Sequence, residues 1–229
     1  MVLDMEILRE LNFVSIIVRV ILALVIGAML GAERGKKHSP AGFKTYMLVC
    51  LGATLVMMTN QYVFQAYHTS DPVRMGAQVI SGIGFLGAGT IIVTGRQQIK
   101  GITTAAGLWV AACCGLAIGI GFYEGAVVGG IFVLVVMVAL NGLDSKIKRN
   151  SKILTIYIEF GGKKSFSSFI EDLREKKIDI IDMQIINNKF TENIDISAVM
   201  NLKIPEKRKH DEVLQVLATA EGVAHVEEI

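Results

Sequence analysis

The apolar half of this 229-residue chain contains very few acidic residues. Between positions 11 and 143 the acids are Glu33, Asp71 and Glu124, set against eight lysines and arginines. Proteins hold Mg²⁺ with carboxylates and retained waters, and cation pores use rings of Asp or Glu. The scarcity of carboxylates at membrane depth therefore disfavours a cation channel.

The sequence also lacks the motifs of common enzyme classes, with no G-x-S-x-G, H-E-x-x-H or Walker loop. The run Gly82-x-Gly84-x-x-Gly87 has the spelling of a dinucleotide-binding loop, but its flanks are apolar and not those of a βαβ unit. No Cys or His spacing is typical of a metal site. We therefore expect a protein that is not an enzyme, with no cofactor and no bound metal. The four histidines are scattered, and we expect surface positions for them: His38, His68, His210 and His225.

Apolar residues make up 52% of the chain, above the ~45–50% that is usual for soluble domains. Almost all the long apolar runs lie within 1–143, and most of the charge lies within 144–229. Five runs approach the ~20 residues that a helix needs to cross a bilayer: Phe13–Gly31, Thr45–Tyr62, Met75–Thr94, Ile102–Ile120 and Phe122–Leu143. We expect a transmembrane domain over 1–143, a basic linker over 144–152 and a second domain over 153–229.

Basic residues are concentrated on one side of these spans. They lie between the first and second spans, between the third and fourth, and after the fifth. Lysine and arginine mark cytoplasmic loops, so we expect the N-terminus outside and the C-terminal domain in the cytoplasm.

Small residues recur at four-residue spacing within several spans. Such faces allow helices to approach closely in lipid, where apolar burial does not drive helix association. We assign helix packing to eight glycines: Gly27, Gly31, Gly82, Gly84, Gly87, Gly89, Gly115 and Gly119.

Charged and polar residues in or beside the spans are candidates for function, because burying them in lipid is costly. Arg19 lies inside the first span, where a functional role competes with snorkelling to the interface. Two more candidates are pairs of opposite charges, which can neutralise themselves locally or anchor helix ends. The full set is Arg19, Glu33, Arg34, Asp71, Arg74 and Gln78.

The C-terminal domain has a mixed pattern of strands and helices. Ile153–Phe160, Ile178–Ile186 and Ile194–Ile204 have strand character, with strict alternation in the last, and Val223–Ile229 is a short final strand. Helical spacing separates the first pair and the last pair of these strands. The order βαββαβ predicts a ferredoxin-like α+β domain.

Four segments of the apolar half resemble the MgtC/SapB family of bacterial inner-membrane proteins. They are RVILALVIGAMLGAERGKK (19–37), AGFKTYMLVCLGA (41–53), DPVRMGAQVISGIGFLGAGTI (71–91) and KGITTAAGLWVAACCGLAIGIG (100–121). The sequence departs from the usual family pattern at Phe43 and Lys44, where Leu-Arg is more common. A role that needs the two-pronged guanidinium of arginine there is in doubt.

The resemblance implies a regulator that supports growth in low magnesium and, in pathogens, survival in macrophages. It implies contact with another membrane complex such as the F-type ATP synthase, and the family is not generally regarded as magnesium transporters. It also implies an ACT-like cytoplasmic domain that serves as a sensor or in homodimerisation, with ligand binding near Gly161 and Gly162. The alternative from the residues themselves is an ion-coupled carrier, for which the basic excess fits an anion better than Mg²⁺.

Overall fold

The computed structural model divides the protein into two compact units. Unit 1 contains the helices up to Asn141, and unit 2 extends from Gly142 to Ile229. The structure describes residues 8–36, 39–68, 71, 73–93, 99–149, 151–161, 163–176, 178–186, 196–204 and 210–229.

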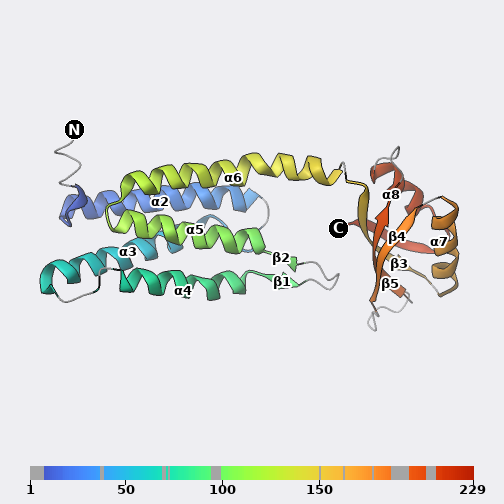
Figure 1. Ribbon diagram of the computed structural model, residues 1–229, viewed down its shortest axis with the longest axis horizontal. Coiled ribbons are helices and arrows are strands. Elements are labelled where there is room, and N and C mark those ends of the chain that lie inside the picture. Colours follow the sequence, from blue (N-terminus) through green and yellow to red (C-terminus); the bar gives the residue numbers. More distant parts are fainter. Residues whose placement is uncertain are drawn as a thin grey trace. The chain divides into compact units, whose positions relative to one another are not determined.

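Unit 1 is a bundle of α-helices (Figure 1). Its helices are α2 (Phe13–Lys36), α3 (Phe43–Tyr67), α4 (Arg74–Gly89), α5 (Ile102–Gly119) and α6 (Tyr123–Arg149). Four of them, all except α4, are long and apolar enough to cross a membrane, which confirms the predicted helical membrane domain. The 16 residues of α4 extend only about 24 Å at 1.5 Å per residue, less than the ~30 Å hydrocarbon core.

The third predicted span ends earlier than its apolar pattern suggests. We expected helix as far as Thr94, but α4 ends at Gly89 and a two-stranded hairpin follows, formed by β1 (Ile92–Val93) and β2 (Ile99–Lys100). The chain then enters α5 through Gly101, whose φ of +100° lies in the left-handed region. A Cβ at this position would lie 1.9 Å from the carbonyl oxygen of Thr90, so only glycine fits.

The core of unit 1 lies where α2, α3 and α5 meet. Its fully buried side chains include Leu30 from α2, Tyr46 from α3 and Leu108 from α5. Glycines bring these helices close: a Cβ on Gly27 would lie 2.8 Å from the Cα of Met47, and one on Gly115 would lie 2.2 Å from the carbonyl oxygen of Cys50. Backbone-to-backbone approach of this kind is the usual basis of helix association in membranes.

The division between the units falls within α6, which continues as helix to Arg149. Most of the segment that we expected to be a basic linker, 144–152, is therefore helical.

Unit 2 is an antiparallel sheet with two helices. Its elements are β3 (Ile153–Phe160), α7 (Lys163–Glu175), β4 (Asp179–Ile186), β5 (Ile196–Lys203), α8 (His210–Ala218) and β6 (Val223–Glu228). The strand order is β4-β5-β3-β6, and every neighbouring pair is antiparallel. This order, with the βαββαβ sequence of elements, confirms the predicted ferredoxin-like arrangement.

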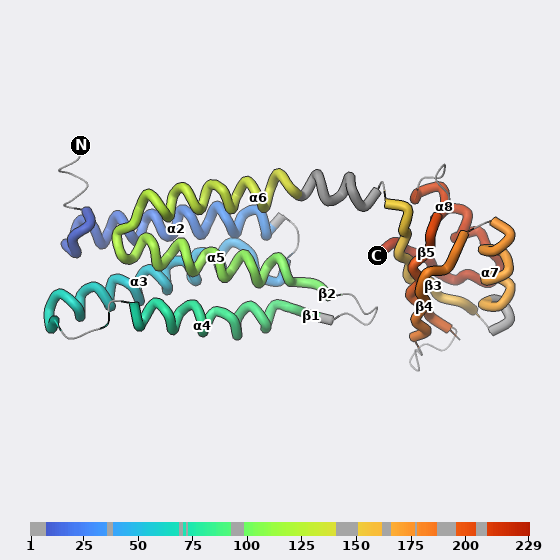
Figure 2. Tube along the Cα trace, in the orientation of Figure 1, coloured from blue at the N-terminus to red at the C-terminus, as the bar shows by residue number. Residues whose placement is uncertain are grey.

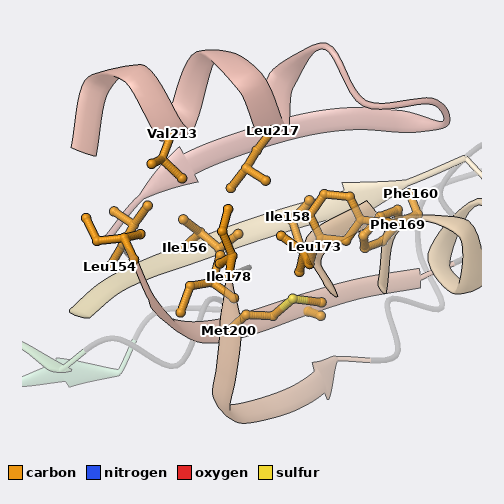
Figure 3. Packing of buried hydrophobic residues seen from close by; sticks show 13 residues of the cluster. Leu154, Ile156, Ile158, Phe160, Phe169, Leu173, Ile178, Met200, Val213 and Leu217 are labelled. Carbon is orange, nitrogen blue, oxygen red and sulfur yellow. The ribbon is translucent and has the colours of Figure 1, made fainter. Parts of the chain in front are cut away.

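The sheet of unit 2 packs its inward-facing side chains against α7 and α8 (Figure 3). Alternate residues of β3, such as Leu154, Ile156 and Ile158, are fully buried. Phe160 meets Phe169 of α7 edge-on, with ring centroids 5.2 Å apart, a favoured aromatic geometry. Apolar residues recur with a period of 2 in the strands and of 3.6 in the helices, so each element has one apolar face. These faces pack together as a two-layer core.

Candidate functional site

Arg19 is fully buried near the start of α2, with no solvent-exposed surface. It does not snorkel to the interface. All five of its N–H donors are occupied: Nε donates to the hydroxyl of Tyr123 at 3.1 Å, Nη1 to Gln61 Oε1 at 2.6 Å and to the Gly119 carbonyl at 2.7 Å, and Nη2 to the carbonyls of Leu8 at 3.3 Å and Arg9 at 2.8 Å.

The oxygens around Arg19 come from three stretches of the sequence: residues 8 and 9, residue 61, and residues 119 and 123. Tyr123 also donates to the Leu8 carbonyl at 2.6 Å, and Gln61 donates through Nε2 to the Arg9 carbonyl at 3.2 Å. The acceptors of Arg19 are carbonyl and hydroxyl oxygens, which carry no full charge. Because every donor is used, Arg19 ties α2, α3, α5 and α6 together and has no vacant N–H for a further ligand.

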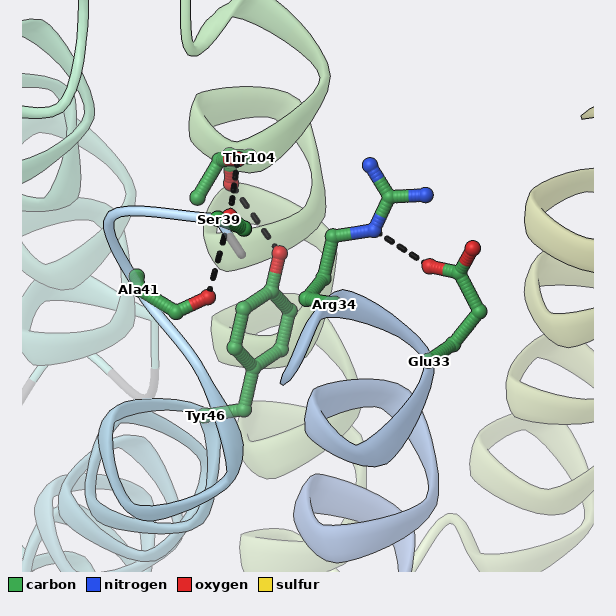
Figure 4. Close-up of polar contacts among 6 residues, drawn as sticks. All are labelled: Glu33, Arg34, Ser39, Ala41, Tyr46 and Thr104. Atoms are coloured by element: carbon green, nitrogen blue, oxygen red, sulfur yellow. Dashed lines mark hydrogen bonds and ion pairs between the residues drawn. The ribbon is translucent and has the colours of Figure 1, made fainter. Parts of the chain in front are cut away.

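A second cluster lies at the opposite end of α2, about 22 Å away along the helix axis. Arg34 is 5% exposed, and its Nε donates to the carboxylate of Glu33 (Figure 4). Its Nη2 is buried and has no hydrogen-bond partner among the described residues. Unlike Arg19, Arg34 therefore retains an unused donor.

Hydrogen bonds among three further residues stabilise this end of the bundle (Figure 4). The hydroxyls of Ser39 and Thr104 are 2.6 Å apart, and Tyr46 donates to the Thr104 carbonyl at 3.1 Å. Gly107 makes room for Tyr46, because a Cβ there would lie 2.3 Å from the tyrosine oxygen. This cluster of hydroxyl groups was not predicted from the sequence, because serine and tyrosine near the end of a span form no distinctive pattern.

The second predicted charge pair does not form within the described chain. Asp71 instead accepts a hydrogen bond from the Val73 amide at 3.0 Å, as in a turn before a helix. Arg74 and Gln78 are both exposed on α4. The Asp71 carboxylate thus contacts the backbone that starts α4, and within the described residues no ion pair joins it to Arg74.

The predicted packing glycines fall into two groups. Added Cβ atoms would lie 2.7 Å from a backbone atom at Gly31 and 2.6 Å at Gly119, and Gly87 meets Ala105 at 3.4 Å. By contrast, a Cβ added at Gly82, Gly84 or Gly89 would have no heavy atom of the described residues within 4 Å. The packing assigned to these last three is therefore not made within the described part of this chain, because they face away from α3 and α5.

In unit 2, Gly161 follows β3, and its amide donates to the Gly222 carbonyl at 3.1 Å. Gly162 lies outside the described residues, and so does His38. His210, expected at the surface, is instead 3% exposed: Nδ1 lies 2.8 Å from Glu228 Oε1 and Nε2 lies 2.8 Å from the Ser151 carbonyl. His210 is the first residue of α8, a position that does not by itself indicate burial, so this role could not be predicted from the sequence.

Within the described residues, no group of three His, Cys, Asp or Glu side chains is placed to hold a metal ion.

The arrangement of apolar helices with buried arginines near both ends of α2 can be compared with known proteins. A model of the MgtC family matches residues 20–146, more than half of the chain. The chain belongs to the MgtC family. The match confirms the resemblance expected from the four segments, and with the apolar helices it makes this a multi-pass membrane protein.

Relatives cover both units of this MgtC-family protein. It is 31% identical over 216 residues to YhiD of Escherichia coli K12, whose name describes it as a candidate magnesium transporter, covering 92% of this chain and 96% of YhiD. SapB of Bacillus subtilis is 32% identical over 212 residues, covering 81% of this chain and 91% of SapB. MgtC of Salmonella typhimurium LT2 is 34% identical over 133 residues, covering 58% and 55%. No solved structure matches the chain significantly.

Proposed function

We propose that this protein is a non-enzymatic regulator in the bacterial inner membrane that supports adaptation to low magnesium by contacting another membrane complex. The magnesium link rests on its family relatives, and the F-type ATP synthase is the partner that the family resemblance suggests. In a pathogen, this role would contribute to virulence. The ferredoxin-like unit would serve as an ACT-like sensor or dimerisation module in the cytoplasm.

The outer face of α4 is the observation that carries this proposal. Gly82 and Gly89 have no described neighbour within 4 Å of a Cβ position, and Phe85 between them is 86% exposed. Positions 82, 85 and 89 lie on one face of the helix. Glycines lower helix propensity by up to about 1 kcal/mol each, so two on a face that contacts only lipid have no benefit. In a membrane, such a face supports close docking of a helix from another protein.

The interior of unit 1 argues against ion transport. Its core is apolar, with Leu30, Cys50 and Ile118 almost or completely buried. The donors of Arg19 are all occupied by protein oxygens. A permeating Mg²⁺ would need carboxylate or water ligands along its path, and neither the sequence nor the described core supplies carboxylates there.

Site-specific photocrosslinking in the membrane would test the proposal. A photoreactive residue at Phe85 of α4 is expected to capture a subunit of the ATP synthase. One at Phe132 of α6, which is 67% exposed, is the matched control and is expected to capture lipid only. Capture of no protein from position 85 would contradict the proposal, as would equal capture from both positions.

A functional test would use glycines that are equally open. Gly82→Leu fills the α4 face, whereas Gly52→Leu fills a position on α3 that likewise has no described neighbour within 4 Å. Overexpression of the Gly52→Leu variant should restrain ATP-driven proton pumping in inverted vesicles as the wild type does, and the Gly82→Leu variant should not. If overexpression of the wild type does not restrain ATP-driven pumping, and proteoliposomes that contain the wild type show anion or Mg²⁺ flux, the carrier alternative would be favoured.

A further inference from the structure

An apolar groove of about 220 Å³ lies between α2 and α6 in unit 1. The two helices lie side by side (Figure 2), and each residue that lines the groove is apolar. Leu22, Ile26 and Leu30 line it from α2, and Gly130 and Leu134 line it from α6. Its rim includes half-exposed side chains on both helices, so the groove opens to the surface that faces lipid.

The groove leads along α2 to the pair formed by Glu33 and Arg34. Ile26, Leu30 and Arg34 are spaced four residues apart, and side chains at this spacing lie on one face of a helix. Met29, on the rim, has the same relation to Glu33. One helical turn, about 5.4 Å, therefore separates the last groove residues from the charged pair.

Arg34 supplies an unmet hydrogen-bond donor at this end. The side chain is more than nine-tenths buried, Glu33 takes only Nε, and the buried Nη2 has no partner among the described residues. A charged donor that is buried without an acceptor is destabilising. The terminal edge of a guanidinium matches the geometry of phosphate oxygens, which can accept two parallel hydrogen bonds.

The charge around this end selects an anion. Between positions 33 and 44 the sequence contains four basic residues, Arg34, Lys36, Lys37 and Lys44, and a single acid, Glu33. Glu33 is already paired with Arg34, so the remaining charge at this end is positive. Clusters of lysine and arginine beside a span attract anionic lipids.

We propose that the groove between α2 and α6 binds one anionic phospholipid, with an acyl chain along Ile26 and Leu30 and the phosphate accepting hydrogen bonds from Arg34. The apolar groove and the unmet donor lie in line, as the tail and head of a lipid do. This assignment does not depend on the regulatory role proposed above, since a transporter could hold the same lipid.

Native mass spectrometry of the full chain, purified from bacterial membranes in mild detergent, would test the site. The probes are phosphatidylglycerol, the zwitterionic phosphatidylethanolamine, and inorganic phosphate. Two variants separate the groove from the rest of α6. Gly130→Leu places a side chain in the groove, where a Cβ would lie 3.5 Å from Ile26, and Gly129→Leu is its neighbour with no described atom within 4 Å.

The wild type and Gly129→Leu are expected to retain one phosphatidylglycerol in preference to phosphatidylethanolamine. Arg34→Gln is expected to lower that retention about tenfold or more, as the loss of a hydrogen bond to a charged group predicts. Gly130→Leu is expected to lower it as well, because the new side chain occupies the space of the acyl chain. If Arg34→Gln does not fold, the comparison of Gly130→Leu with Gly129→Leu is sufficient to test whether the lipid binds in the groove. Equal retention of both lipids by the wild type, equal loss in the two glycine variants, or displacement of the lipid by inorganic phosphate would overturn the proposal.

Discussion

The guanidinium of Arg19 donates a hydrogen bond to the backbone carbonyl of Gly119, 2.7 Å away and a hundred residues further along the chain. Gly119 is also a point of close helix contact, because a Cβ there would lie 2.6 Å from the Cβ of Met57. The buried arginine and the missing side chain thus act together, fixing the end of α5 against α2 and α3.

Replacing Arg19 should destabilise unit 1. Arg19→Met leaves the acceptors on Gln61 and Gly119 without their donor, and we expect a loss of about 3 kcal/mol or more. Arg19→Lys supplies three donors without the planar fork and should be intermediate. The measurement is the unfolding midpoint in detergent, followed by the fluorescence of Trp109, the single tryptophan. An unchanged midpoint in Arg19→Met would show that the network adds nothing to stability.

Alanine should have opposite effects at two glycines. At Gly115 the new Cβ would lie 2.2 Å from the carbonyl oxygen of Cys50, so α5 must move away from α3, at a cost of about 1–3 kcal/mol. At Gly82 the Cβ meets no described atom, and the better helix propensity of alanine should stabilise α4 by up to about 1 kcal/mol. Unfolding of the two variants in the same detergent makes the comparison, and similar shifts would contradict the assigned packing.

The sequence predicted regular elements well where side-chain periodicity and length agreed. The expected strand Ile153–Phe160 coincides with β3 at both ends, because its even-numbered residues are all apolar and fully buried and Gly161 follows. We predicted that α4 ends later than it does, because Ile91–Val93 is as apolar as a turn of a membrane-spanning helix. There, Thr90 closes the helix by donating both its amide and its hydroxyl to the Gly87 carbonyl, at 3.0 and 2.7 Å.

The environment of the buried arginines could not be read from the sequence for a different reason. Arg19 is held largely by backbone carbonyls of Leu8, Arg9 and Gly119, and every residue type carries a carbonyl. Only the fold brings those three positions together. The same holds for Gly82 and Gly84, which lie in the same glycine-rich segment as the packed Gly87, while their direction on α4 depends on where α5 lies.

His210 is expected to stabilise unit 2. Its Nε2 lies 2.8 Å from the Ser151 carbonyl, which can only accept, so this nitrogen carries a proton. His210→Ala removes this contact and the one to Glu228, and we expect a loss of about 1–3 kcal/mol. Hydrogen–deuterium exchange of the β6 amides in the full chain should accelerate. The control is His225→Ala, an exposed position on β6, and equal acceleration in both variants would argue against a special role for His210.

The last prediction separates function from stability at the two ends of the bundle. Arg74 is exposed and makes no ion pair with Asp71 in the described chain, so Arg74→Ala should leave the protein level in the membrane unchanged while growth support at low Mg²⁺ is lost. Glu33→Ala removes the carboxylate from a nearly buried Arg34, so it should lower both growth and protein level. Immunoblots and growth rates in a deletion strain measure the two effects, with the exposed Arg174→Ala in α7 as control. Wild-type growth of the Arg74→Ala strain would mean that Arg74 only anchors the end of α4 at the interface.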